Sequence, residues 1–131
     1  MVKHYKELNV WQKAMEVVND IYKLTASFPK DEVYGLTSQI RRAAVSIPSN
    51  IAEGAARDTT KDFLRFISIT QGSLAELETQ ILIANNQDFV SEGDIFPLVR
   101  KMSDIGKMLN GLQKSLNDKS QATDHRSQAT E

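Results

Sequence analysis

The chain has 131 residues, of which 40% are hydrophobic and 25% are charged, as is ordinary for one soluble globular domain with one core. Its 16 Lys and Arg residues nearly balance 17 Asp and Glu residues, and the net charge of -1 creates no global field that would attract nucleic acid or an anionic membrane. The absence of cysteine excludes disulfides, thiolate zinc sites and cysteine nucleophiles.

The polar N-terminal sequence MVKHYKELNVW lacks the apolar run of a signal peptide. Apolar runs elsewhere are far shorter than a membrane span. We therefore expect a cytoplasmic protein with no membrane partner.

The first helical pattern covers residues 10–28 and has two neighbouring apolar stripes, which together are wider than a simple coiled-coil seam. The helix is expected to end near Phe28-Pro29, because the residue before proline disfavours the helical region. One stripe contains Val10, Ala14, Val17, Ile21, Leu24 and Phe28, and the other contains Trp11, Met15, Val18, Tyr22 and Thr25.

The second pattern, over residues 36–56, has Pro48 in its middle. We predict that the helix continues through Pro48 with a kink, and that Ser46, Ser49 or water satisfies the backbone that proline exposes. Polar residues spaced by four, three and four form one line that fits a hydrogen-bonded packing or subunit surface better than a catalytic centre, with a simple solvated face as the alternative. This polar line contains Ser46, Asn50, Glu53 and Arg57.

Two further patterns alternate spacings of three and four. In the third, over residues 59–86, Thr59 and Asp62 resemble a capping box, and the apolar positions are Phe63, Ile67, Thr70, Leu74, Leu77, Ile81 and Ala84. In the fourth, Ser91 is the expected N-cap, and the apolar positions are Ile95, Leu98, Met102, Ile105, Leu109, Leu112 and Leu116.

These four amphipathic segments predict an all-α protein, an antiparallel up-down four-helix bundle over residues 1–116. After Leu116 the apolar pattern stops, and Ser-Gln-Ala-Thr occurs twice in the polar sequence that follows. We expect residues 117–131 to be a disordered tail, because they cannot bury enough apolar surface to order themselves.

Catalytic patterns are not evident. The two histidines lie in the polar ends, away from any helical face with a carboxylate, and the chain has no P-loop, no GxGxxG and no Glu-x-x-His pair. Glu76 and Glu78 are two residues apart and therefore point to different helix faces. We expect no enzymatic activity, no catalytic residues, no cofactor, no metal and no small-molecule substrate.

The charges are unevenly distributed along the chain. Residues 34–65 contain five basic and three acidic residues, a net charge of +2, whereas residues 66–96 contain five acidic residues and no Lys or Arg. Ordinary solvated faces, complementary surfaces of identical subunits and RNA phosphate binding are three interpretations, in that order of preference. The residues of interest for subunit or RNA contact are Arg41, Arg42, Arg57 and Arg65, which lack interleaved aromatic residues.

Apolar residues also exceed what one bundle core needs. The double stripe with Trp11 and Tyr22 offers a wide face, and residues 59–86 add Leu64, Phe66, Ile69, Leu82 and Ile83 off their main stripe. Apolar residues around most of a helix imply burial on two sides, which favours a homo-oligomer over a well-covered monomer.

Three segments resemble a known family: LNVWQKAMEVVNDIYKLT, FPKDEVYGLTSQIRRAAVSIPSNIAEGAAR and FLRFISITQGSLAELETQILIA. They are similar to the small bacterial four-helix-bundle proteins encoded by 23S rRNA intervening sequences, with a likeness that covers roughly Lys6 to Leu116. The resemblance implies an up-down bundle that assembles into a ring-shaped homopentamer and associates with RNA or the ribosome. The family is also similar to the accessory protein of diversity-generating retroelements, which partners a reverse transcriptase.

Three functions follow as hypotheses. The first is a homo-oligomeric assembly or scaffold protein whose surfaces recruit RNA, the ribosome or a protein partner. The second is a nucleic-acid-binding accessory module that partners a reverse transcriptase or rRNA through the four arginines. The third and most remote is a small enzyme that uses a carboxylate such as Glu53 or Glu76.

Overall fold

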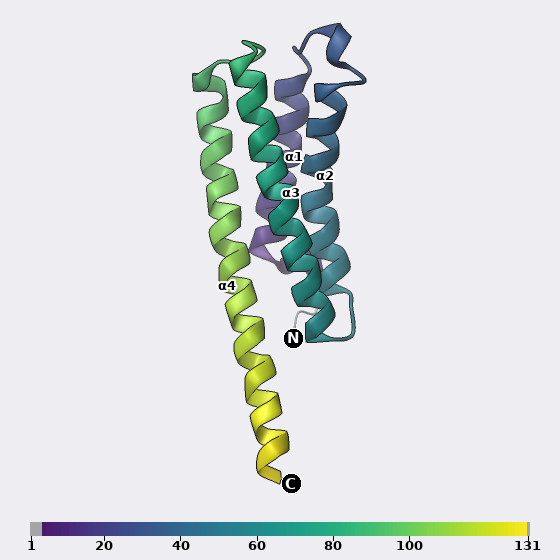
Figure 1. The fold of residues 1–131 in the computed structure, drawn as a ribbon, viewed down its shortest axis with the longest axis vertical. Coiled ribbons are helices and arrows are strands. Elements are labelled where there is room, and N and C mark those ends of the chain that lie inside the picture. The colour runs from purple at the N-terminus through teal and green to yellow at the C-terminus, as the bar shows by residue number, and fades with distance from the viewer. Residues whose placement is uncertain (1–3, 131) are drawn as a thin grey trace.

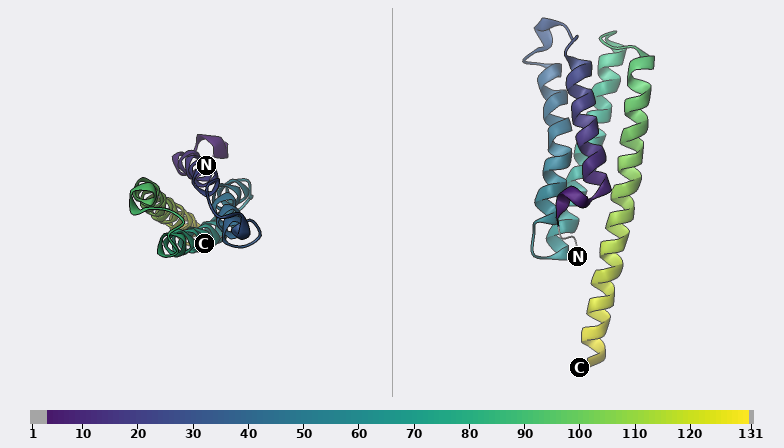
Figure 2. Two further views of the ribbon diagram at one scale, coloured as in Figure 1. Left: turned by 90° about the horizontal axis from the view of Figure 1, so that it is seen from above. Right: turned by 180° about the vertical axis from the view of Figure 1, so that it is seen from behind.

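The computed structural model describes residues 4–130, with the side chains of residues 4–120. Four long helices follow one another, each antiparallel to the next (Figure 1). Around the bundle, α1 contacts α2, α2 contacts α3, α3 contacts α4, and α4 returns to α1 (Figure 2). The predicted all-α antiparallel four-helix bundle is thus confirmed. The elements in chain order are η1 (Tyr5–Glu7), α1 (Asn9–Thr25), η2 (Lys30–Glu32), α2 (Leu36–Ala55), α3 (Thr60–Asn86) and α4 (Glu92–Thr130), where η marks a short 3-10 helix.

The core contains the apolar residues that recur at helical spacing. All four helices contribute side chains that are almost fully removed from water, and the hydrophobic effect of this burial stabilises the bundle. The largest of these side chains are Ile21, Ile40, Ile47, Ile51, Ile67, Leu77, Ile81, Met102, Ile105 and Leu109.

The helix starts predicted for α3 and α4 are confirmed by their caps. The Thr59 hydroxyl accepts a hydrogen bond from the Asp62 amide at 3.1 Å. The Ser91 hydroxyl likewise accepts from the Asp94 amide at 3.1 Å. Each cap satisfies an N–H group that has no partner within its own helix, and the predicted end of α3 at Asn86 also agrees with the structure.

Helix α2 continues through Pro48, as the sequence predicts, whereas the kink itself stays a prediction. Proline at this position frees the carbonyl of Ala44. The Ser46 hydroxyl does not donate a hydrogen bond to this freed carbonyl of Ala44, because it donates to the carbonyl of Ala43 at 2.6 Å.

Helix α1 ends earlier than expected, at Thr25 instead of near Phe28. The Thr25 hydroxyl donates to the carbonyl of Ile21 at 2.8 Å, and the Thr25 carbonyl accepts from the Phe28 amide in a tight turn. This turn buries Phe28 over the end of the core, where its ring lies 5.7 Å from the ring of Phe89. The chain thus leaves the helix three residues before Phe28, whose side chain packs over the end of the core.

Helix α4 differs from the expected disordered tail over residues 117–131, because its backbone stays helical through Thr130 and projects beyond the other helices (Figure 1). The sequence after Gly111 contains neither proline nor glycine. Extending an existing helix by one residue costs far less than nucleating a new one, so polar residues can continue it. The domain boundary after residue 116 stays a prediction.

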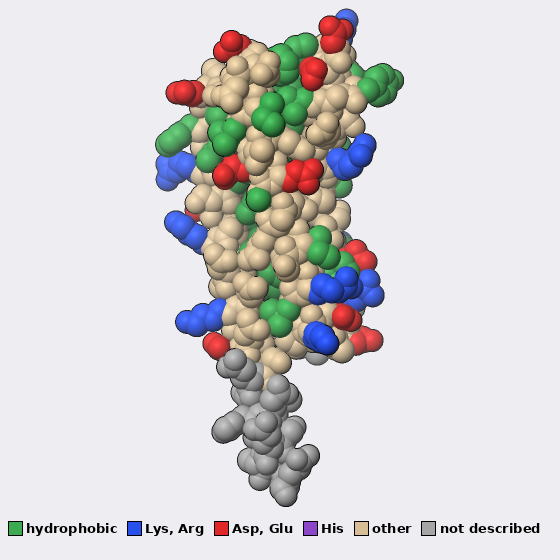
Figure 3. Space-filling model, viewed as in Figure 1, with side chains coloured by type: hydrophobic (Ala, Val, Ile, Leu, Met, Phe, Trp, Pro, Cys, Tyr) green, Lys and Arg blue, Asp and Glu red, His purple; other side chains and the backbone are tan. Residues whose placement is uncertain are grey.

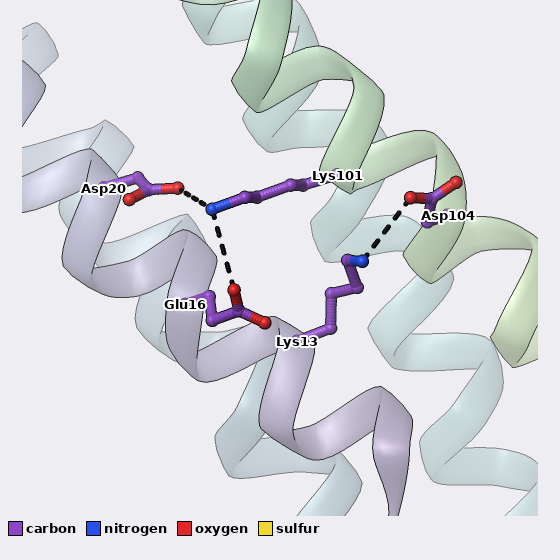
Figure 4. Close-up of polar contacts among 5 residues, drawn as sticks. All are labelled: Lys13, Glu16, Asp20, Lys101 and Asp104. Carbon is purple, nitrogen blue, oxygen red and sulfur yellow. Dashed lines mark hydrogen bonds and ion pairs between the residues drawn. The ribbon is translucent and has the colours of Figure 1, made fainter.

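Ion pairs link α1 to α4 on the surface of the bundle (Figure 4). The Lys101 ammonium lies 2.8 Å from Asp20 Oδ2 and 3.7 Å from Glu16 Oε1, and Lys13 Nζ lies 3.5 Å from Asp104 Oδ2. The hydrogen bond that Lys101 donates to Asp20 outweighs the partial desolvation of Lys101 and raises the pKa of its ammonium above the ordinary value of 10.5. These pairs join the first and last helices.

Replacing Lys101 with methionine should lower the free energy of unfolding by about 0.2–1 kcal/mol at neutral pH, as is typical of exposed ion pairs. Because the pKa of Lys101 is raised in the folded state, its contribution is complete below the unfolded pKa and is lost as pH rises through the folded pKa. Urea unfolding of both proteins at neutral pH and at about pH 11 should show the difference shrinking at high pH. Lys107→Met, which removes an exposed α4 lysine, is the control, and an equal loss in both variants would contradict the prediction.

Candidate interaction surfaces

The four arginines singled out in the sequence do not form one patch. Arg41 and Arg42 lie near the start of α2, and Arg57 and Arg65 lie around its opposite end, at the connection to α3. Between Arg41 and the end of α2 at Ala55 the helix advances 14 residues, or roughly 21 Å. One RNA backbone or one subunit contact would have to span that length to use all four side chains.

The pair at the α2–α3 connection is engaged within the protein. Arg57 Nη2 lies 2.9 Å from Glu53 Oε1, which is the i,i+4 pair that the sequence indicates. The guanidinium carbons of Arg57 and Arg65 lie 5.0 and 4.8 Å from the centroid of the Phe66 ring. Phe66 itself is only 6% exposed, so this residue off the main stripe of the third pattern is buried within the monomer. Its ring packs on Gly54 and is covered by two arginines.

The other pair lies in an aromatic environment that the sequence analysis missed. The Arg41 guanidinium carbon is 4.6 Å from the centroid of the Tyr22 ring, in cation–π geometry. Arg41 Nε donates to Thr25 Oγ1 at 2.8 Å, and Arg42 Nη2 lies 3.4 Å from Ser38 Oγ. Both arginine pairs therefore have aromatic partners, one from α1 and one from α3, contrary to the expectation from the sequence.

Arg41 and Arg42 line a groove at the end of the bundle, between the end of α1, η2 and the start of α2, with a volume of about 570 Å³. We call it the helix-end groove. Tyr34 beside it is 98% exposed, whereas Thr37 is 5% exposed and its hydroxyl has no hydrogen-bond partner among the described residues. Lys30 adds a third cation. The groove is therefore basic, with aromatic walls and a buried donor.

The polar line of α2 consists of two hydrogen-bonded pairs. Asn50 Nδ2 donates to the carbonyl of Ser46 at 2.8 Å, and Arg57 pairs with Glu53. Ser46 and Asn50 are half-buried, and Glu53 and Arg57 are exposed. Arg57 lies beyond the end of α2 at Ala55, so the prediction that the whole line belongs to the second helix is wrong at this residue. Both bonds are local along the chain, and a packing or subunit role for the line stays a prediction.

An apolar surface follows the length of α1 and α2, below the helix-end groove. Its shallow groove of about 320 Å³ lies between one apolar stripe of α1 and the outer side of α2, and no charged residue lines it. Met15 and Val45 are exposed, and Trp11 and Val18 are half-buried. We call this surface the α1–α2 face, and its lining residues are Tyr5, Trp11, Met15, Val18, Val45, Pro48, Ser49 and Ala52.

A second exposed surface lies on α3. Ile69, Gly72, Glu76 and Ile83 share one side of this helix by their spacing, and all four are exposed. We call this the α3 face. Figure 3, viewed with α3 toward the reader, shows hydrophobic side chains at the surface on this side of the molecule. The bundle therefore has two unlike surfaces with exposed apolar residues.

The carboxylates considered in the sequence analysis have ordinary local partners in the described part of the chain. No group of three or more His, Asp or Glu side chains there is placed to hold a metal ion. Glu76 Oε1 accepts a hydrogen bond from Gln80 Nε2 at 3.1 Å, and Glu53 pairs with Arg57. None of the described helices is long and apolar enough to cross a membrane.

The residues that sequence reasoning missed belong to the helix-end groove. Lys30, Tyr34 and the arginine pair lie within thirteen consecutive residues, 30–42, and this mixture of basic and aromatic types was a usable signal. Tyr22 and Thr25 could not be found that way, because only the antiparallel packing of α1 on α2 brings them to Arg41.

Comparison with known proteins agrees with this fold. A crystal structure of a protein of unknown function from the S23 ribosomal protein family of Bacteroides thetaiotaomicron superposes with a TM-score of 0.72, at 21% identity, over 80% of this chain and 98% of that one. At this identity the likeness establishes the fold alone. Curated proteins give no match. Residues 6–111 match the family described as 23S rRNA-intervening sequence protein, and the chain belongs to that family.

Proposed function

We propose that this chain is a non-enzymatic, cytoplasmic assembly or scaffold protein that forms a homo-oligomer. The observation that carries the proposal is the α1–α2 face, where Met15 and Val45 expose large apolar side chains in an uncharged groove. Exposed apolar surface of this kind favours a protein contact, because association removes it from water.

The two surfaces differ in a way that supports a head-to-tail contact between copies. The α3 face includes the acidic Glu76, and residues 66–96 contain no Lys or Arg, whereas Arg41 and Arg42 share a groove with Val45 of the α1–α2 face. Unlike surfaces of opposite charge pair heterologously, and heterologous contacts close into rings when the rotation permits. The proposed assembly is a ring, and the family resemblance supports five subunits.

The test is the oligomeric state of three proteins. Wild type should elute as a multiple of the 14.7 kDa chain in size-exclusion chromatography with light scattering. Met15→Lys places a charge in the uncharged groove and should release monomers at micromolar concentration, because burying an unpaired charge is costly. Ser103→Lys, which adds the same charge to an exposed position of α4, should leave the assembly intact. A wild-type monomer would refute the proposal.

Mixing variants tests the head-to-tail arrangement. Ile83→Lys should block the α3 face as Met15→Lys blocks the α1–α2 face, so that each variant alone is monomeric. Each still has one intact surface, and the mixture should therefore form one-to-one dimers but no ring. If the mixture stays monomeric while wild type is oligomeric, the two surfaces do not pair with each other.

A nucleic-acid-binding role is the second candidate. It is favoured by the exposed Tyr34 ring beside Arg41, Arg42 and Lys30, since stacking rings and cations together bind single-stranded nucleic acid. The RNA or ribosome partner would then contact the helix-end groove, and the engaged Arg57 and Arg65 would contribute less. The third hypothesis, a carboxylate enzyme, gains no support from the surroundings of Glu53 and Glu76.

A further inference from the structure

The helix-end groove has the composition of a binding site for an anion. Lys30, Arg41 and Arg42 line it, and none of the described residues that line it is an Asp or Glu. The nearby carboxylate of Glu32 is turned to the start of α2, where its Oε1 lies 3.4 Å from the Leu36 amide. Three positive charges therefore face the same space without a carboxylate among them.

Arg41 is held in place before any ligand arrives. Thr25 Oγ1 donates to the Ile21 carbonyl at 2.8 Å and, with a remaining lone pair, accepts from Arg41 Nε at 2.8 Å. The Tyr22 ring supports the guanidinium at 4.6 Å. The terminal nitrogens of Arg41 make no hydrogen bond to the described residues. A fixed guanidinium with free terminal nitrogens binds a carboxylate or phosphate in bidentate geometry at low entropic cost.

Thr37 gives an independent sign of a ligand. Thr37 is one of the groove's lining residues and is 5% exposed, and its hydroxyl oxygen is buried with no partner among the described residues. Buried polar groups nearly always have a hydrogen-bond partner, and an exception needs an explanation. An oxyanion bound between Arg41 and Thr37 would accept the hydrogen bond that Thr37 can donate, once the Thr37 side chain shifts to expose its buried hydroxyl to the groove.

The rest of the groove fits an apolar or aromatic body. Tyr22 and Tyr34 expose their rings, and Val33 is half exposed. The volume of about 570 Å³ lies in the range of small-molecule sites. We infer that the helix-end groove binds a small organic oxyanion, a carboxylate or phosphate attached to an aromatic body, with the anion on Arg41, Arg42 and Thr37 and the ring against Tyr34.

Titration calorimetry of the full chain tests this inference with phenyl phosphate and benzoate as probes. Both anions should bind, whereas phenol, which has the same ring without the charge, should not. Arg41→Gln should weaken phenyl phosphate binding by about ten- to hundredfold, because a hydrogen bond to a charged group is lost. Arg100→Gln, which removes an arginine beside Phe96 on α4, is the matched control and should bind as wild type does.

Thr37→Val distinguishes a ligand role from a structural one. It should weaken phenyl phosphate binding by about two- to tenfold. The melting temperature without ligand should stay the same or rise, because the variant removes a buried hydroxyl that has no partner. A loss of stability together with unchanged binding would mean that Thr37 serves the fold, and the inference would be overturned.

Two further probes are a single-stranded oligouridine and inorganic phosphate. The mass of each variant is measured by light scattering, so that a loss of binding can be distinguished from a loss of assembly. Oligouridine binding without phenyl phosphate binding would overturn the inference in favour of the nucleic-acid candidate. Absence of binding by every probe would overturn the inference. If Arg41→Gln also loses assembly, the groove is a subunit contact instead. Tighter binding of phenyl phosphate than of inorganic phosphate supports the aromatic part of the site.

Discussion

Replacing Gly54 with alanine is expected to destabilise the protein, although alanine is the better helix former. A Cβ atom at this position would lie 2.6 Å from Phe66 Cβ and 3.1 Å from Phe63 Cδ1. Because Cβ atoms move only with their backbone, α2 and α3 would have to separate where they approach closely. Overpacking of this kind costs about 1–3 kcal/mol. The gain in helix propensity from glycine to alanine is about 0.8–1.0 kcal/mol, so the net effect is a loss of stability of up to about 2 kcal/mol.

The measurement is urea unfolding followed by circular dichroism, with Gly111→Ala as the matched control. Gly111 is an exposed glycine of α4 at which an added Cβ would meet no atom within 4 Å. Its replacement should raise the free energy of unfolding by about 0.5–1 kcal/mol, since alanine restricts the unfolded chain. Equal stabilisation by both substitutions would show that the distance between α2 and α3 at Gly54 is larger than in the structure.

Leu109→Ala is expected to have the largest effect on stability. The side chain of Leu109 is 0% exposed in α4, and its truncation should cost about 2–5 kcal/mol through lost burial and the cavity that remains. Leu116, two turns further along, is only half-buried, and Leu116→Ala should cost clearly less. The comparison locates the end of the core along α4.

Both unfolding series need a monomeric background, because the apparent stability of an oligomer depends on protein concentration. Met15→Lys is intended to provide this background, since Met15 is exposed on the α1–α2 face. Similar losses for Leu109→Ala and Leu116→Ala would contradict the prediction, and would place the end of the core beyond residue 116.

The sequence by itself determined the four helices and much of their inward faces, because side chains three and four residues apart lie on one side of a helix regardless of the surroundings. The caps at Thr59 and Ser91 were equally readable, since a cap is made by residues three apart in the chain. Continuation of α2 through Pro48 was also predicted, because the apolar residues keep their helical spacing on both sides of the proline. The length of α4 was not predicted, because apolar periodicity shows where a helix packs against others and does not show how far it continues beyond them.

Tertiary structure alone decided which surfaces these helices build. Spacing predicted Arg41 and Arg57 on the same helix, whereas α2 ends at Ala55 before Arg57. It could not show that Arg41 lies beside Tyr22 and Thr25 and Arg57 on Phe66. It also could not reveal that the Thr37 hydroxyl is buried without a partner. Such contacts join residues of different helices, and they depend on the antiparallel register of the bundle, which many side chains set together and no single local pattern encodes.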